Sequence, residues 1–192
     1  MRVIAGRYKG RKLTSPQGTE LRPTPDMVKE AIFGIIGSGI ESSVCLDLFA
    51  GSGALGIEAL SRGAARCYFA DASRRSISLL RSNLETIGIE AVFHRDASDA
   101  AAEAVIIARD YRAALRSLGA QVDYAFIDPP FDSGCYATVM KLLADYDIIK
   151  PGGVVIVECD KNIPEYAHEG FAGVAVKNYG RIALNFWERT GI

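Results

Sequence analysis

Asp47, Asp71 and Asp128 each lie at or near the end of an apolar run typical of a buried strand. Carboxylates in such positions can accept hydrogen bonds from hydroxyl or amino groups, or face a cationic ligand. In a parallel sheet the carboxyl ends of the strands share one edge, and ligands bind there. These residue types and positions therefore predict one polar binding site at that edge.

The first of these runs leads into a glycine-rich segment, D-L-F-A-G-S-G-A-L-G at 47–56. Gly51 and Gly53 let the backbone turn tightly and approach a ligand without a Cβ clash. Dinucleotide-dependent dehydrogenases use a G-x-G-x-x-G pattern too, and a tight turn without a ligand is a further alternative. Asp47 favours a cationic group, such as the amino group of a methionine moiety, because a carboxylate is unfavourable beside a pyrophosphate.

Two further acids complete the expected cofactor site. Asp71, twenty residues after Gly51, follows the second run, where a carboxylate accepts hydrogen bonds from ribose hydroxyls in dehydrogenases and methyltransferases alike. Asp96 follows the third run and could meet an adenine edge, cap the following helix, or do both. Together these residues favour an adenosine-containing ligand.

Asp128-Pro129-Pro130-Phe131 is the motif that points to a substrate. Two prolines after an acid make a stiff, non-helical backbone, which can present the Asp128 carboxylate and the Pro129 carbonyl as two fixed acceptors. The exocyclic amino group of a base has two N–H donors that match such a pair, and Phe131 could stack on an unstacked base. A purely structural Pro-Pro turn is the alternative.

The elements that would position these residues alternate between strand and helix. We expect strands at 44–49, 66–70, 91–94, 122–127 and 154–158, helices at 25–36, 54–62, 74–87, 98–117 and 136–145, and a hairpin of 171–177 with 181–187. This alternation predicts an α/β fold with a mostly parallel sheet covered on both faces. The closing hairpin favours the seven-stranded class I, Rossmann-like methyltransferase variant, with a C-terminal antiparallel hairpin and a small N-terminal hairpin and helix extension.

Charge is distributed unevenly along a chain whose net charge is −1. Residues 1–30 are basic and the remainder is acidic, so the amino-terminal arm could contact phosphates while the body avoids general adhesion to polyanions. An ordinary solvated hairpin is the alternative. We expect one domain over 1–192, with a basic arm at 1–24 and a catalytic core at 25–192. The candidate RNA-binding residues are Arg2, Arg7, Lys9, Arg11, Lys12 and Arg22.

Composition excludes several classes of protein. The 192 residues are 49% hydrophobic, which suits a compact domain, and no apolar run reaches the roughly 18 residues that span a bilayer. The start is too short and too soon interrupted by charge for a signal peptide, so we expect a soluble cytoplasmic protein, most simply a monomer. Cys45, Cys67, Cys135 and Cys159 are widely spaced and have no histidine at ligand spacing, which predicts buried thiols and no metal.

The segments D-L-F-A-G-S-G-A-L-G-I-E-A-L-S-R-G-A at 47–64 and D-P-P-F at 128–131 resemble the RsmD family of class I methyltransferases, as do 2–13 and 21–33. That family methylates a guanine N2 of bacterial 16S ribosomal RNA. The resemblance implies S-adenosylmethionine as the cofactor, ribosomal RNA or the small ribosomal subunit as the partner, and residues 128–131 as the base site. Many members have Glu where this chain has Asp71. The expected cofactor contacts are Asp47, Phe49, Ala50, Gly51, Ser52, Gly53, Asp71, Ala72, Asp96, Ala97 and Asp128.

Other functions stay open at this point. Similar Pro-Pro-aromatic motifs occur in enzymes that act on adenine N6, cytosine N4 or a protein glutamine. A nicotinamide-dependent oxidoreductase would use the glycines and Asp71 but leaves Asp47 and Asp128 without a role. The sequence does not reveal the target nucleotide, or whether free RNA or an assembled particle is the substrate.

Overall fold

The computed structural model describes residues 1–15, 26–94, 102–130, 133–161 and 168–191. Its elements follow one another as α1 (Asp26–Ile36), the 3-10 helix η1 (Gly37–Ile40), β1 (Val44–Asp47), α2 (Ala54–Ser61), β2 (Arg66–Ala70), α3 (Arg74–Thr86), β3 (Ala91–Phe93), β4 (Ala104–Ile107), α4 (Tyr111–Ser117), β5 (Val122–Ile127), α5 (Tyr136–Asp145), β6 (Ile149–Asp160), β7 (Phe171–Tyr179) and β8 (Ile182–Arg189). The arrangement is the expected α/β fold.

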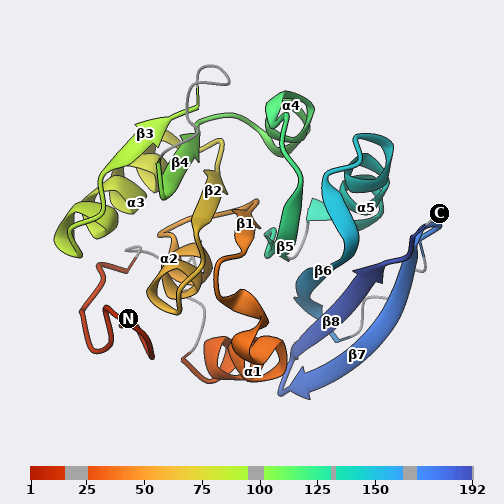
Figure 1. Cartoon of the computed structure of the whole chain (residues 1–192), viewed down its shortest axis with the longest axis horizontal. Coiled ribbons are helices and arrows are strands. Elements are labelled where there is room, and N and C mark those ends of the chain that lie inside the picture. Colours follow the sequence, from red (N-terminus) through yellow and green to blue (C-terminus); the bar gives the residue numbers. More distant parts are fainter. Residues whose placement is uncertain (16–25, 95–101, 131–132, 162–167, 192) are drawn as a thin grey trace.

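Within the described residues the strands form one eight-stranded sheet in the order β3-β4-β2-β1-β5-β6-β8-β7 (Figure 1). β1 pairs in parallel with β2 and with β5, whereas β8 runs antiparallel to β6 and to β7. Strands β2, β3 and β4 thus lie on one side of β1, and the strands from β5 onward lie on its other side. This arrangement puts the switch in strand order between β1 and β5, where open α/β sheets bind their ligands.

Successive side chains of each central strand point to opposite faces of the sheet and pack into two separate hydrophobic cores. Cys45, Phe69 and Phe126 pack with α1, α2 and α3, whereas Leu46 and Ala125 pack with α4 and α5. This alternation is what a strand period of two residues requires when both faces are covered. Figure 1 shows the two groups of helices on opposite sides of the sheet, with the amino-terminal arm beside α2.

One expected helix is wrong. Residues 98–117 were predicted to be helical because they are rich in alanine, but Ala104–Ile107 is the strand β4, and within the described part of this range, 102–117, only Tyr111–Ser117 is helical. β4 lies between β2 and β3 with all its residues buried, so pairing and packing of the run Ala-Val-Ile-Ile outweigh the local helix propensity. This strand accounts for eight strands where seven were expected.

The amino-terminal arm differs in detail from the expected hairpin. Within residues 1–15 its two sides are joined by one isolated bridge, between Arg2 and Lys12, and by three backbone hydrogen bonds, from Val3 to Arg11, from Gly10 to Val3 and from Leu13 to Met1. Packing adds to this pairing, because Val3 and Leu13 are buried in the core with residues of α1, α2 and α3. The four cysteines are buried with free thiols, as predicted.

Candidate functional site

The glycine-rich loop joins β1 to α2 at the carboxyl edge of the sheet. The Ala50 N–H donates to the Ala70 carbonyl at 3.0 Å, which fixes the loop against the end of β2. Gly51 and Gly53 have φ angles of 54° and 82°, in the left-handed region that favours glycine. A Cβ at Gly53 would overlap Leu80 of α3, whereas one at Gly51 would meet nothing closer than the Phe49 carbonyl at 3.9 Å. Gly53 therefore permits packing, and Gly51 leaves an open face that a ligand can approach.

Two carboxylates hold this loop from the sheet side. Asp71 accepts hydrogen bonds from the Gly51 N–H at 2.9 Å and from the Ser73 N–H at 2.7 Å. Asp47 accepts one from the Gly56 N–H at 2.9 Å. Carboxylate oxygens have further lone pairs, so these bonds leave Asp71 able to accept from hydroxyl groups as well. Both acids thus shape the loop, and Asp71 keeps capacity for a ligand.

Asp47 is an ionisable group in an unusual environment. Its side chain is only 3% exposed. Burial, together with the charges of Asp128 and Asp71, raises its pKa to about 7, although the hydrogen bond from Gly56 opposes the shift. A nearby cationic group would stabilise the ionised form of this carboxyl. The site is therefore prepared to favour positive charge at the end of β1.

A cavity of about 520 Å³ opens along α3, next to the residues that follow β2 and β4, and no residue of the glycine-rich loop lines it. Ala72 and Ala108 line it at the sheet edge, and Arg74, Ile77 and Arg81 line it along α3. Among the other expected cofactor contacts, Ala50 and Ser52 are buried. The Phe49 ring packs against Tyr111 with 5.6 Å between ring centroids. The structure thus gathers most of these residues around one edge of the sheet.

The Asp128-Pro129-Pro130 segment lies at the same edge. Asp47 of β1 pairs in register with Phe126 of β5, so the two strands end side by side and their following loops are neighbours. Pro129 is buried, and none of the described residues donates a hydrogen bond to its carbonyl. The glycine-rich loop and the diproline segment therefore flank the switch point between β1 and β5.

A second buried acid, Glu158, accompanies Asp128. Ile127 pairs in register with Val157, so Asp128 and Glu158 follow at the same level on neighbouring strands. Glu158 is 5% exposed. Burial, followed by the charge of Glu158, raises the pKa of Asp128 well above its usual range. The Asp128 carboxyl consequently retains its proton to a higher pH than an isolated aspartate does.

Tyr136, at the start of α5, belongs to the same surroundings. Its hydroxyl is buried and has no hydrogen-bond partner among the described residues. Burial raises its pKa, and the charges of Cys159, Asp128, Cys135 and Glu158 add to the shift. A buried hydroxyl usually finds a partner, so Tyr136 can offer a hydrogen bond beside the two acids.

Sequence reasoning missed Glu158 and Tyr136. Glu158 ends the apolar run 154–157, which is the same signal that singled out Asp47, Asp71 and Asp128. Tyr136 carries no comparable signal, because an aromatic residue at the start of a helix is usually a core residue. Four expected site residues, Arg22, Asp96, Ala97 and Phe131, lie outside the described residues.

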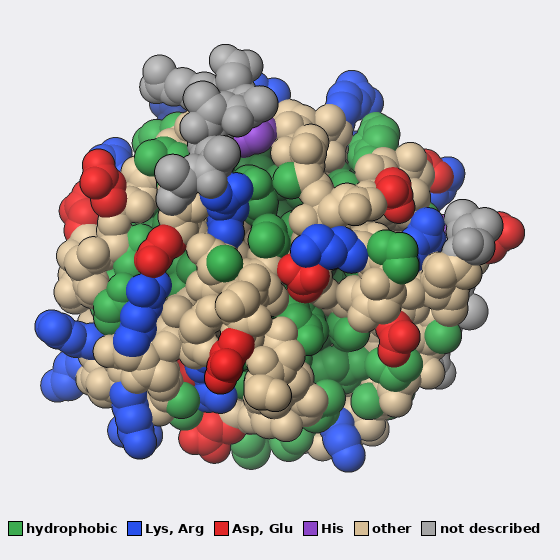
Figure 2. Space-filling view, in the orientation of Figure 1, with side chains coloured by type: hydrophobic (Ala, Val, Ile, Leu, Met, Phe, Trp, Pro, Cys, Tyr) green, Lys and Arg blue, Asp and Glu red, His purple; other side chains and the backbone are tan. Residues whose placement is uncertain are grey.

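The basic residues of the arm divide into two groups. Arg2 pairs with Asp26 at 3.2 Å, and Arg7 pairs with Glu103 at 2.6 Å. Lys9, Arg11 and Lys12 are exposed and form no ion pair with any described residue. Figure 2 shows basic side chains gathered at the lower left, over the arm. The three unpaired residues are therefore the ones with charge available for phosphates.

The described residues offer neither a metal-binding cluster nor a membrane-spanning helix. The described residues contain no group of three or more His, Cys, Asp or Glu side chains arranged to hold a metal ion. None of the helices in the described part of the chain is both long enough and apolar enough to cross a bilayer.

Comparison with known proteins adds the family. The family model described as "Conserved hypothetical protein 95" matches residues 1–188. "Ribosomal RNA small subunit methyltransferase D" of Haemophilus influenzae is 32% identical over 190 residues, covering 98% of this chain and 93% of that protein. The chain belongs to the RsmD family.

Other relatives agree with this membership. The "Putative rRNA methyltransferase YlbH" of Bacillus subtilis is 39% identical over 166 residues, covering 85% of this chain and 84% of that protein. The solved structure of a "Putative methyltransferase yhhF" from Escherichia coli superposes with a TM-score of 0.83 at 32% identity, covering 99% of this chain and 98% of the other. Membership of the RsmD family and these relatives support a methyltransferase that acts on ribosomal RNA.

Proposed function

We propose that this protein transfers the methyl group of S-adenosylmethionine to the exocyclic N2 of a guanine in 16S ribosomal RNA, in the cytoplasm. One observation carries the proposal. The glycine-rich loop and the Asp128-Pro129-Pro130 segment follow neighbouring parallel strands, β1 and β5, at the switch point of the sheet. A donor held by the first and a base held by the second can meet in one crevice.

The residues around the loop fit this cofactor. Gly51 leaves its open face to the ligand, Asp71 can accept hydrogen bonds from ribose hydroxyls, and Asp47 favours a cationic amino group. When bound, S-adenosylmethionine supplies an electrophilic methyl group on a sulfonium. The cavity lined by Ala72, Ala108 and α3 offers room beyond the end of β2, the strand that Asp71 follows.

The diproline segment fits an amino group that must be aligned. A guanine amine is a poor nucleophile because its lone pair is conjugated with the ring. The Asp128 carboxylate and the Pro129 carbonyl accept its two N–H groups, which increases electron density on nitrogen and fixes its direction. Donation from the base favours the ionised form of Asp128, opposing the effect of Glu158. Alignment requires the nitrogen about 3–3.5 Å from the methyl carbon.

RNA must also present the base outside its stack, because its amino edge is otherwise out of reach. Lys9, Arg11 and Lys12 are available to hold the surrounding phosphates, since none of them is paired with an acid of the described residues. An acidic body with a basic arm limits such contacts to one side of the molecule.

Replacing Asp128 tests the proposal. The substrate for this test is small ribosomal subunits purified from a strain that lacks the enzyme. Asp128→Ala removes one acceptor and should lower the rate of their methylation on the order of 100-fold or more. Asp128→Asn keeps one amide oxygen as an acceptor and should retain more activity than the alanine variant. Because Asp128 is also an expected cofactor contact, affinity for S-adenosylmethionine, measured by calorimetry, should fall in both variants, but far less than methylation does.

The product identifies the substrate atom. Mass mapping of the modified RNA should locate the methyl group on a guanine N2. A methyl group on adenine N6 or cytosine N4 would reject the guanine assignment while keeping methyl transfer. Wild-type turnover in Asp128→Ala would reject the role of the diproline segment.

A further inference from the structure

Asn83 of α3 connects three segments that are distant in the sequence. Its side chain is 1% exposed. Its Oδ1 accepts from the Thr14 N–H at 2.8 Å, and its Nδ2 donates to the Thr14 carbonyl at 3.1 Å and to the Ser52 carbonyl at 2.9 Å. Because a buried amide without partners is costly, these three bonds specify where the arm and the glycine-rich loop lie relative to α3.

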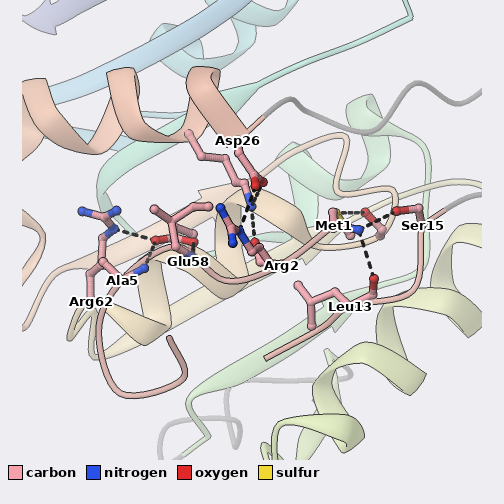
Figure 3. A network of polar contacts seen from close by, with 11 residues as sticks. Met1, Arg2, Ala5, Leu13, Ser15, Asp26, Glu58 and Arg62 are labelled. Carbon is pink, nitrogen blue, oxygen red and sulfur yellow. Dashed lines mark hydrogen bonds and ion pairs between the residues drawn. The ribbon is translucent and has the colours of Figure 1, made fainter. Parts of the chain in front are cut away.

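The start of the chain reinforces the same junction. The Met1 amino group donates to Ser15 Oγ at 3.0 Å and to the Leu13 carbonyl at 3.4 Å, so the first residue of the chain lies against residues 13–15 (Figure 3). The Ser52 hydroxyl contacts the Met1 sulfur at 3.7 Å. Ser52 is itself buried, so protein contacts rather than solvent set the orientation of its peptide.

Asn83 completes a three-sided support of the loop. Asp71 holds the Gly51 N–H from β2, and Asp47 holds the Gly56 N–H from β1. On the third side, α3 contributes Asn83 to Ser52 and packs Leu80 against Gly53. Asp71 and Asp47 form no described bond to the arm, whereas Asn83 hydrogen-bonds both Thr14 and Ser52, so with the Ser52–Met1 contact it links the arm to the loop.

We propose that Asn83 is a positioning residue for cofactor binding, which holds the Ser52 peptide in place and couples it to the amino-terminal arm. The inference rests on the proposed function, in which this loop holds S-adenosylmethionine. Coupling between two sites is reciprocal. Binding of the cofactor therefore makes the arm more rigid, and binding of RNA to the arm increases the affinity for the cofactor.

Cofactor affinity tests the positioning role with a matched control. Asn83→Ala removes all three hydrogen bonds and should raise the Kd for S-adenosylmethionine about tenfold or more, as measured by calorimetry. Asn83→Asp keeps an acceptor for Thr14 but faces two carbonyls without an N–H to donate, and should weaken binding similarly. Leu84→Ala, at the next and equally buried position of α3, destabilises the core but removes no side-chain hydrogen bond to the loop or the arm. Its Kd should stay within about twofold of the wild type, since the loop contacts remain.

Hydrogen exchange tests the coupling to the arm. Adding S-adenosylmethionine to the full-length wild type should slow exchange of the Thr14 amide, and in Asn83→Ala this slowing should disappear. Equal affinities in Asn83→Ala and Leu84→Ala, or unchanged cofactor protection of Thr14 in Asn83→Ala, would overturn the inference. A wild type that does not bind S-adenosylmethionine at all would instead reject the proposed function.

Discussion

At the scale of single residues, the acids at the sheet edge combine two tasks that usually conflict. Asp47 is buried deeply enough to lose most of its hydration, yet it must remain available for a charged ligand. The hydrogen bond from the Gly56 N–H compensates part of that desolvation and simultaneously fixes the start of α2. An uncharged asparagine could form the same bond, so the carboxyl adds something that the loop alone does not need.

The buried carboxyl of Asp47 makes stability depend on pH. Its pKa of about 7 lies above its ordinary value of 3.8, so the folded protein keeps this proton where the unfolded chain loses it. The stabilising effect of that proton is complete below about pH 4 and is lost as the pH rises through about 7. The side chain in Asp47→Asn cannot titrate. Between pH 4 and 8 the free energy of unfolding of this variant should therefore fall less than that of the wild type, and the difference should be on the order of 1–3 kcal/mol.

Urea unfolding of both proteins without cofactor, at intervals between pH 4 and 8, measures the effect. Parallel stability curves for the wild type and Asp47→Asn would contradict the raised pKa. A difference confined to the expected range would also identify Asp47 as a group whose ionisation a cationic ligand can favour.

At the scale of elements, the arm is attached to α2 by buried polar groups. Glu58 is fully buried and accepts hydrogen bonds from the Ile4 and Ala5 N–H groups and from Arg62 Nε, as Figure 3 shows for Ala5 and Arg62. Ser61 accepts from the Tyr8 N–H and donates to the Ala5 carbonyl. The arm is thus a structural part of the domain, and its basic side chains project from a fixed backbone.

Two glycines of the arm provide a matched test of this attachment. Gly6 and Gly10 have nearly equal φ angles of 81° and 82°, so alanine is strained at both. Only at Gly6 would the Cβ overlap the Ser61 carbonyl, whereas at Gly10 it meets nothing within 4 Å. Gly10→Ala should cost about 1–2 kcal/mol of stability, or less if the strain relaxes. Gly6→Ala should cost roughly 1–3 kcal/mol more, or release the arm locally.

Thermal unfolding and limited proteolysis of the arm compare the two variants. Equal losses of stability, together with equal resistance of the arm to cleavage, would show that contact between Gly6 and α2 is unimportant. Faster cleavage in Gly6→Ala alone is the expected result.

The elements differ in how well their sequence predicted them. The helix predicted at 74–87 is α3, Arg74–Thr86, and Ser73 caps it, since its hydroxyl accepts from the Ser76 N–H. The span of α5 was predicted at 136–145 and is Tyr136–Asp145. β4 was missed because its pairing with β2 and β3 cannot be predicted from the local propensities of its residues. Asn83 was missed for a related reason, since a polar residue on an amphipathic helix gives no local sign of distant partners.

At the scale of the whole molecule, the sheet divides the proposed chemistry between two halves. β1, β2 and β4 carry the loop and cavity assigned to the cofactor, whereas β5 and β6 carry Asp128 and Glu158. Val3 and Leu13 of the arm share a core with α1, α2 and α3, on one face of the sheet. The basic side chains of the arm therefore lie on the side of the molecule that carries α2 and α3.

Salt dependence of RNA binding tests which arm charges matter. The triple variant Lys9→Gln, Arg11→Gln, Lys12→Gln removes the three charges that no acid of the described residues neutralises. Each phosphate contact on single-stranded RNA contributes about 0.7 to the slope of log K against log salt, so the slope should flatten by about 2. The double variant Arg7→Gln, Glu103→Gln removes an existing ion pair without changing the net charge, and should leave the slope nearly unchanged.

Small subunits or a 16S ribosomal RNA fragment serve as the ligand, with binding measured from about 50 to 200 mM salt, a range over which several phosphate contacts change affinity strongly. An equal slope in the triple variant and the wild type would remove the arm from the RNA interface and leave its structural role at α2 intact. A flattened slope in the Arg7 and Glu103 variant would mean that Arg7 exchanges its carboxylate for a phosphate when RNA binds. Because the arm backbone is fixed by Glu58 and Asn83, neither set of surface changes should alter cofactor affinity, which separates charge from architecture.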